Sequence, residues 1–160
     1  MTNTHQSVLE SALSPNAPYK IRIIDDHDWI IRGLSTSLEM NEEYKVVATA
    51  QYADEARQRM GREVNLFIMD IRLPPSYGKE IQPNCGIDLA AEFHKNYPDS
   101  AILSLSGETK VALVQRAWAA GAWGYILKNH ASHVEDAINA VRRNGRYSDP
   151  GLQKYQRKIY

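Results

Sequence analysis

Residues 64–74 read VNLFIMDIRLP, an almost continuous apolar run that ends at the carboxylate of Asp70. An apolar run of strand length without polar alternation is typical of a strand that is buried on both faces. Such strands belong to parallel sheets that carry helices on both sides. The stretch Val64–Met69 therefore predicts a strand of an α/β fold, with Asp70 at its carboxyl end.

Similar apolar runs alternate with stretches of helical periodicity along the rest of the chain. The predicted strands are Lys20–Asp25, Val46–Ala50, Val64–Met69, Ala101–Leu105 and Trp123–Leu127. Apolar residues recur every three or four positions within 30–38, 53–60, 89–97, 111–118 and 134–141, which predicts a helix in each range. Five βα units of this kind predict a five-stranded parallel sheet with helices on both faces and right-handed crossovers.

Some segments fall outside this pattern. Residues 1–18 are polar and are expected to form a flexible leader, 19–145 to fold as one domain, and 146–160 to form a linker. The segment Ile71–Cys85 holds three prolines and a glycine, which predicts an unusually long loop directly after Asp70.

The composition predicts a globular domain and excludes several other classes of protein. Of the 160 residues, 43% are hydrophobic and 24% charged, which argues against a disordered chain. The 19 basic and 19 acidic residues balance, so the net charge predicts no attraction to nucleic acid or to a membrane. No apolar stretch approaches the roughly 20 residues of a membrane-spanning helix. The single cysteine, Cys85, excludes an internal disulfide and a cysteine-based zinc site, and we expect a cytoplasmic location.

Four of the predicted strands end in polar residues that can carry chemistry. These residues are Asp25 with Asp26, Asp70, Ser106 and Lys128. In an open parallel sheet, ligands bind beyond the carboxyl ends of the strands. We therefore expect three acids, one hydroxyl group and one ammonium group to meet at the same end of the sheet.

Physical chemistry limits what this set of residues can do. Three close carboxylates repel one another unless a cation lies between them, and a set of oxygen ligands suits Mg²⁺. A carboxylate beside that cation can attack phosphorus and form an acyl phosphate, while the lysine and the hydroxyl hold the phosphoryl oxygens. Each residue alone has a simpler explanation, because Asp26 can cap the next helix and Ser106 or Lys128 can be an ordinary surface residue. Their coincidence at four strand ends favours chemistry.

Four motifs resemble those of the receiver domains of bacterial two-component response regulators. The motifs are IIDDH at 23–27, FIMDIRLP at 67–74, LSLSG at 103–107 and AGAWGYILK at 120–128. The resemblance extends over most of the chain, and it implies a flavodoxin-like (βα)5 fold with strand order 2-1-3-4-5.

The resemblance also implies a role for each residue of the set. Asp70 is implied as the acceptor of a phosphoryl group from a histidine kinase, and Lys128 as its charged partner. Asp25 and Asp26 are implied to hold Mg²⁺ together with Asp70 and the main-chain carbonyl of Arg72. A receiver is implied to catalyse its own phosphoryl transfer and dephosphorylation, as a signalling switch and not as an enzyme with turnover.

Phosphorylation is implied to change one surface of the protein. Ser106 is implied as the switch hydroxyl that turns toward the phosphoryl group, and Tyr125 as the aromatic residue whose rotamer follows it. The responding surface is implied to comprise the helices around 111–118 and 134–141 and the strand 123–127 between them.

The motifs IIDDH and GYILK and the stretch GRYSDP at 145–150 are most similar to receivers that precede a helix-turn-helix DNA-binding domain. The chain is then expected to be a truncated form, with a stand-alone receiver as the alternative. We expect a homodimer that contacts DNA only through an output domain outside these 160 residues. Trp118 is expected to pack in the core, and Trp123 to contribute to the dimer contact because aromatic residues favour interfaces.

The sequence departs from the family pattern in three places. The loop 71–85 is several residues longer than usual, and Gly86 rather than Gly78 matches the family glycine. Asn129 stands where many receivers carry a proline. Trp29 follows the acidic pair closely, and its ring is expected to pack over the first helix.

Three other functions fit parts of the sequence. A receiver-like module that binds proteins without phosphorylation fits the fold, and the unusual loop favours it. An aspartate-nucleophile phosphatase needs a second acid two residues after the nucleophile, where this chain has Arg72. A flavin carrier needs hydroxyls and amides in its first loop, where Asp25–Asp28 would repel a phosphate. The sequence therefore favours the phosphorylation-dependent switch.

Overall fold

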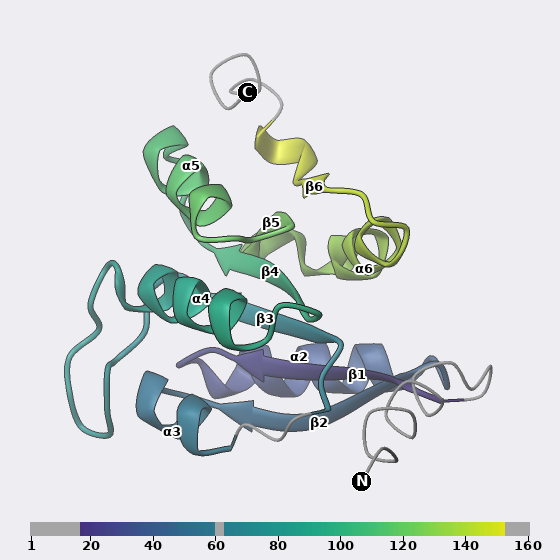
Figure 1. The fold of residues 1–160 in the computed structure, drawn as a ribbon, viewed down its shortest axis with the longest axis horizontal. Coiled ribbons are helices and arrows are strands. Elements are labelled where there is room, and N and C mark those ends of the chain that lie inside the picture. Colours follow the sequence, from purple (N-terminus) through teal and green to yellow (C-terminus); the bar gives the residue numbers. More distant parts are fainter. Residues whose placement is uncertain (1–16, 60–62, 153–160) are drawn as a thin grey trace, which may run out of the picture.

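The computed structural model describes residues 17–59 and 63–152, so most of the expected leader and the end of the expected linker lie outside the described residues. One sheet of six parallel strands has the order β2-β1-β3-β4-β5-β6 (Figure 1). The strands are β1 Tyr19–Ile24, β2 Tyr44–Ala50, β3 Leu66–Asp70, β4 Ala101–Ser106, β5 Gly124–Leu127 and β6 Tyr147–Ser148. The predicted order 2-1-3-4-5 is confirmed for the first five strands.

Helices cover both faces of the sheet, as the βα alternation predicts. Helices α2 (Asp28–Glu39) and α6 (Val134–Arg142) pack on one face. Helices α3 (Ala53–Gln58), α4 (Cys85–Asn96) and α5 (Val111–Ala119) pack on the other (Figure 1). A short 3-10 helix, η1, runs from Lys128 to His133 and joins β5 to α6.

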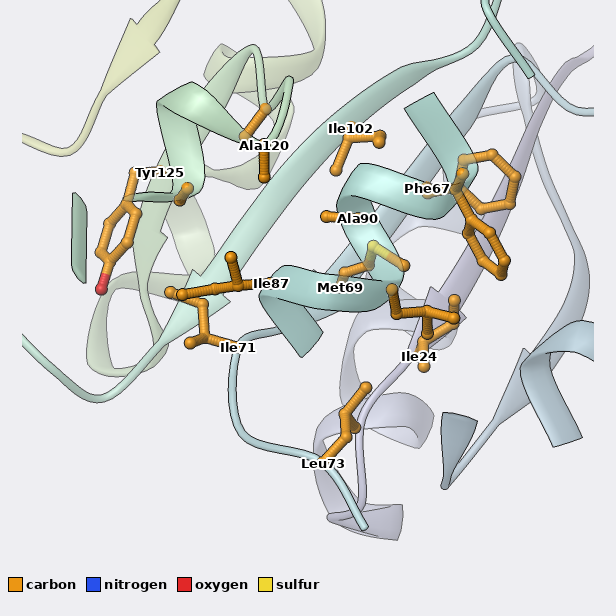
Figure 2. Close-up of a cluster of buried hydrophobic side chains, with 14 of the residues drawn as sticks. Ile24, Phe67, Met69, Ile71, Leu73, Ile87, Ala90, Ile102, Ala120 and Tyr125 are labelled. Atoms are coloured by element: carbon orange, nitrogen blue, oxygen red, sulfur yellow. The ribbon is translucent and has the colours of Figure 1, made fainter. Parts of the chain in front are cut away.

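Buried apolar side chains form a separate core on each face of the sheet. All five residues of β3 are buried, in agreement with its apolar sequence. On the face covered by α4, Ile87 and Ala90 lie in one cluster with Met69 and Ile71 (Figure 2). Burial of apolar surface stabilises the fold by about 25 cal/mol per Å². The two cores therefore hold the strands in a fixed register, and with them the polar residues at the strand ends.

The sixth strand corrects the prediction of a five-stranded sheet. Strand β6 pairs in parallel with β5, and the main-chain N–H of Tyr147 donates to the carbonyl of Trp123 over 2.9 Å. Leu152, four residues beyond β6, is fully buried. A strand of two residues is too short to produce an apolar period, so the sequence indicated only a polar linker at this point.

The long loop between β3 and α4 is fixed at both ends. Leu73 and Gln82 form an isolated antiparallel bridge, and the carbonyl of Pro74 accepts a hydrogen bond from the main-chain N–H of Ala53 in α3. At the far end of the loop, a Cβ atom on Gly86 would lie only 1.9 Å from the carbonyl oxygen of Asp70. A glycine at position 86 therefore allows α4 to begin directly against the end of β3.

Candidate functional site

The carboxyl ends of β1, β3, β4 and β5 meet at one end of the sheet and bring the predicted site residues together. They surround a pocket of about 360 Å³. Its lining residues are Asp26, His27, Asp70, Arg72, Ile81, Ser106, Gly107, Glu108 and Lys128. Asp25, which is fully buried, contacts two of these residues, His27 and Lys128. The predicted meeting of three acids, a hydroxyl and an ammonium group is confirmed in space.

Lys128 is the charged partner of two buried carboxylates. Its ammonium group donates a hydrogen bond to Asp70 Oδ2 over 2.7 Å and another to Asp25 Oδ1 over 3.1 Å. Asp25 is 0% exposed and Asp70 is 4% exposed. A buried carboxylate is costly unless it is paired. One ammonium group cannot neutralise two carboxylates, so the site carries excess negative charge even before Asp26 is counted.

The excess of negative charge in the site changes the pKa of Asp70. Burial and the nearby charge of Asp25 raise the pKa of Asp70 to about 7, although Lys128 and the main-chain N–H of Arg72 act in the opposite direction. Burial alone would lower the pKa of Lys128, but Asp70 and Asp25 raise it above its ordinary value. The pocket therefore stabilises the protonated ammonium group of Lys128. It supplies too little positive charge to offset the negative charge of an ionised Asp70.

The acidic residues fit a divalent cation. Asp25, Asp26, His27 and Asp70 each offer a ligand atom, and these atoms all lie within 4.8 Å of one another. Asp26 Oδ1 is buried and has no hydrogen-bond partner among the described residues. Helix α2 takes His27 as its N-cap, with no side-chain capping bond, so the simpler explanation of Asp26 as a cap is wrong. Arg72 lines the pocket, and its carbonyl as a metal ligand stays a prediction.

His27 belongs to the site although it was not among the predicted site residues. Its Nδ1 lies 3.1 Å from Asp25 Oδ1, 3.2 Å from Asp26 Oδ1 and 3.2 Å from the Lys128 ammonium group. Its position directly after the acidic pair was the available signal. The ring of Trp29 packs edge-on against His27, with centroids 5.9 Å apart, and is 67% exposed. The expectation of a Trp29 ring packed over the helix is therefore wrong.

Ser106 and Tyr125 are linked through the loop after β4. The hydroxyl of buried Ser106 accepts a hydrogen bond from the main-chain N–H of Glu108 over 3.0 Å. The hydroxyl of Tyr125 donates to the carbonyl of the same residue over 2.8 Å. Burial raises the pKa of Tyr125 to about 12, so this hydroxyl stays protonated and a donor. A movement of the loop at Glu108 would therefore change the hydrogen bonds of both hydroxyls.

The two tryptophans expected on the responding surface are both half-buried. Trp118 packs against the core under α5, as predicted, and the guanidinium of Arg146 lies 5.3 Å from its ring centroid. Trp123 packs partly against the opposite core, beside α6. Its contribution to a dimer contact stays a prediction.

The raised pKa of Asp70 predicts a pH-dependent gain in stability for Asp70→Asn in metal-free protein. The native state holds the proton of Asp70 up to about pH 7, whereas an unfolded aspartate loses it near its ordinary value of 3.8. Stability is therefore lost as pH rises from about 4 to about 7. An asparagine avoids this loss, so we expect the variant to melt roughly 3–8 °C higher than the unmodified chain at pH 8 and with a smaller difference at pH 5.

Thermal unfolding followed by circular dichroism in EDTA at both pH values checks this prediction. Asp28→Asn, at an exposed aspartate of α2, is the matched control and should show no such pH-dependent difference. Equal melting temperatures of Asp70→Asn and the unmodified chain at pH 8 would contradict the raised pKa.

Comparison with known proteins supports the assignment that the motifs suggested. The model of the response regulator receiver domain family matches residues 21–139. The transcriptional regulatory protein LnrK of Bacillus subtilis is 34% identical over 135 residues, which are 83% of this chain and 58% of LnrK. The oxygen regulatory protein NreC of Staphylococcus carnosus is 33% identical over 135 residues, which are 83% of this chain and 59% of NreC. The chain thus spans less than two thirds of these relatives.

Solved structures share the fold. The isolated receiver domain of RcsB from Salmonella enterica serovar Typhimurium, determined with the phosphomimetic BeF3⁻, superposes with a TM-score of 0.74 at 20% identity. The match covers 86% of this chain and 97% of that one. A two-component response regulator of the LuxR family from Aurantimonas sp. SI85-9A1 gives a TM-score of 0.73 at 25% identity and covers 89% and 99% of the two chains. Within the described residues, no helix is both long enough and apolar enough to cross a lipid bilayer.

Proposed function

Because the chain belongs to the response regulator receiver family, we propose that it is a phosphorylation-dependent switch whose Asp70 accepts a phosphoryl group from a histidine kinase. The observation that carries the proposal is the contact between the Lys128 ammonium group and Asp70, 2.7 Å long, at the wall of an acidic pocket. A buried carboxylate with a fixed ammonium partner can act as nucleophile, and the partner can then hold the product's charge.

Asp70, Lys128 and the main-chain N–H of Arg72 have different roles in phosphoryl transfer. Asp70 Oδ attacks the phosphorus of a phosphohistidine and forms a P–O bond, the P–N bond breaks, and its electron pair stays on the imidazole nitrogen, which takes up a proton from water. The Lys128 ammonium group is within reach of the oxygens of a phosphoryl group on Asp70 and offsets their charge. The main-chain N–H of Arg72 donates to Asp70 Oδ1 over 3.1 Å and orients the carboxylate.

Mg²⁺ is the cation that this site suits, because oxygen ligands and a pocket with room for water match its preferences. Asp25, Asp26 and Asp70 would hold it, with the carbonyl of Arg72 as a further ligand. When bound, the ion neutralises carboxylate charge and lowers the repulsion that an incoming phosphoryl group meets.

The signal would leave the site through the loop after β4. A phosphoryl group on Asp70 attracts the hydroxyl of Ser106, which then releases the main-chain N–H of Glu108. Because Tyr125 is bonded to the carbonyl of Glu108, the movement reaches β5 and the surface that it forms with α5 and α6. This surface would be the one that pairs in a homodimer.

The relatives suggest the setting of the switch. LnrK carries the name of a transcriptional regulatory protein. We therefore place this receiver in the cytoplasm, upstream of a transcriptional output, with DNA contacted by a domain outside the described residues.

Acetyl phosphate, a small phosphoryl donor, tests the proposal. We expect the 160-residue chain to gain the mass of one phosphoryl group in the presence of Mg²⁺ and to gain none in EDTA. Hydroxylamine should remove the added mass, because it cleaves acyl phosphates. Equal labelling with and without metal would contradict the role of the acidic pocket. A chain that neither takes up phosphate nor responds to beryllofluoride would instead be a phosphorylation-independent binding module.

A further inference from the structure

A second cluster of metal-ligating side chains lies outside the acidic pocket, where the C-terminal segment crosses the start of η1. His130, His133 and Asp149 each offer a ligand atom, and these atoms lie within 4.8 Å of one another. The cluster contains no cysteine, so cysteine spacing in the sequence could not indicate it. We propose that His130, His133 and Asp149 form a second divalent-metal site, suited to Zn²⁺, that ties residues 147–152 to the junction between β5 and α6.

Asp149 is held in place as a metal ligand needs to be. Its side chain is 0% exposed. The main-chain N–H of Gly151 donates to Oδ1 over 2.8 Å, and that of Leu127 donates to Oδ2 over 2.9 Å. Each carboxylate oxygen keeps further accepting capacity after these bonds. Such outer hydrogen bonds fix the orientation of ligating carboxylates in known metal sites.

The charge of Asp149 also favours a cation. Among the described residues, the groups that form ion pairs with this buried carboxylate are His130 and His133, and neither is charged when its imidazole is neutral. A buried carboxylate without a positive partner is unfavourable. A divalent ion would supply that charge and would use the two imidazoles in the neutral form that binds metals.

The two histidines approach Asp149 at distances that suit a shared ion. His130 Nδ1 lies 2.8 Å from Oδ1, and His133 Nδ1 lies 3.9 Å from Oδ2. Ligands of a tetrahedral zinc ion, each about 2.1 Å from the metal, lie roughly 3.4 Å apart, so the two distances bracket the expected value. His133 Nδ1 is buried and has no hydrogen-bond partner among the described residues. An ion at this point would satisfy it.

Gly151 lets the C-terminal segment close over the cluster. A Cβ atom at this position would lie 3.1 Å from Asp149 Oδ1, 3.1 Å from His130 Cε1 and 2.7 Å from Leu127 Cδ1. Two imidazoles and a carboxylate are a ligand set that Zn²⁺ prefers and that Mg²⁺ does not. The chain would then hold two different metals close together in the sequence: Mg²⁺ in the acidic pocket that Lys128 lines, and Zn²⁺ at the cluster that contains His130.

Isothermal titration of the 160-residue chain with Zn²⁺, in excess Mg²⁺ to occupy the acidic pocket, tests the site. We expect one Zn²⁺ per chain and at least about tenfold weaker affinity in His130→Gln and in His133→Gln. His94→Gln, which removes an exposed imidazole of α4, is the matched control and should bind Zn²⁺ like the unmodified chain. Because His133 Nδ1 forms no hydrogen bond with any residue in 17–59 or 63–152, His133→Gln should fold normally, and circular dichroism checks this before titration.

A second measurement separates this site from the acidic pocket. At one Zn²⁺ concentration, the melting temperature should rise by a similar amount in the unmodified chain and in His27→Gln, and should rise clearly less in His133→Gln. Unchanged Zn²⁺ affinity in His133→Gln would overturn the proposal, and so would Zn²⁺ binding that is lost in His27→Gln and kept in His130→Gln. A double variant, His130→Gln with His133→Gln, that binds Zn²⁺ as well as the unmodified chain would also overturn the proposal and would leave His130 only as a hydrogen-bond partner of Asp149. None of these outcomes depends on phosphorylation of Asp70.

Discussion

The Asp70→Asn variant is expected to take up no phosphoryl group from acetyl phosphate in Mg²⁺, under conditions in which the unmodified chain is labelled. The amide of asparagine has no anionic oxygen to attack phosphorus, so the covalent step itself is removed. The structure leaves room for the variant to fold, because Asp70 and Asn have nearly the same shape and the main-chain N–H of Arg72 can still donate to the side-chain oxygen. Intact-mass spectrometry measures the loss directly.

Two neighbouring aspartates provide controls for this experiment. Asp28→Asn changes an exposed aspartate that pairs with Arg32 on α2, and it should be labelled like the unmodified chain. Asp26→Asn removes a predicted metal ligand but keeps the nucleophile, so it should be labelled more slowly and should need more Mg²⁺. If Asp70→Asn carried as much phosphate as the unmodified chain, the assignment of the phosphoacceptor would be wrong.

Lys128→Ala is expected to bind Mg²⁺ and yet fail to respond to beryllofluoride. The proposed ligands of the ion are carboxylates that remain in the variant, whereas the ammonium group that contacts Asp70, and that we propose to hold a phosphoryl analogue, is gone. Removal of one partner from a buried ion pair costs on the order of 3–5 kcal/mol, so the variant should be less stable, and Mg²⁺ should restore part of that loss. Amide chemical shifts of residues 106–110, before and after addition of beryllofluoride, measure the response.

Lys110→Ala is the matched control for Lys128→Ala. Lys110 lies in the loop between β4 and α5 and is exposed, and its ammonium group is 3.8 Å from Glu108. Its removal should leave the shift changes at Ser106 and Glu108 intact. Normal beryllofluoride-induced shifts in Lys128→Ala would exclude the proposed role of the lysine.

The core of the site was predictable because it depends on strand ends. Where an apolar run of this kind stops in the sequence, the strand reaches its carboxyl end. Parallel strands place their carboxyl ends at the same end of the sheet. Asp25, Asp70, Ser106 and Lys128 could therefore be placed without knowledge of any distance. The burial of β3 at all five positions confirms the first step of that argument.

Other features depend on contacts that no period in the sequence indicates. His27 reaches Lys128 across 101 positions of the chain, and His130 reaches Asp149 across 19. Trp29 is exposed because its position on α2 points away from the core, although its residue type favours burial. Strand β6 was missed because main-chain pairing with β5 produces it, and not its own two side chains.

The C-terminal segment has a practical consequence for fragments of this protein. The carbonyls of Trp123 and Tyr125 accept hydrogen bonds from Tyr147 and Asp149, and the N–H of Leu127 donates to the Asp149 carboxylate. A fragment cut at residue 145, the domain end expected from the sequence, would expose β5 as an open, apolar edge strand. Unpaired edges of this kind recruit strands from other molecules and promote aggregation. A fragment that extends to Leu152 keeps that edge covered.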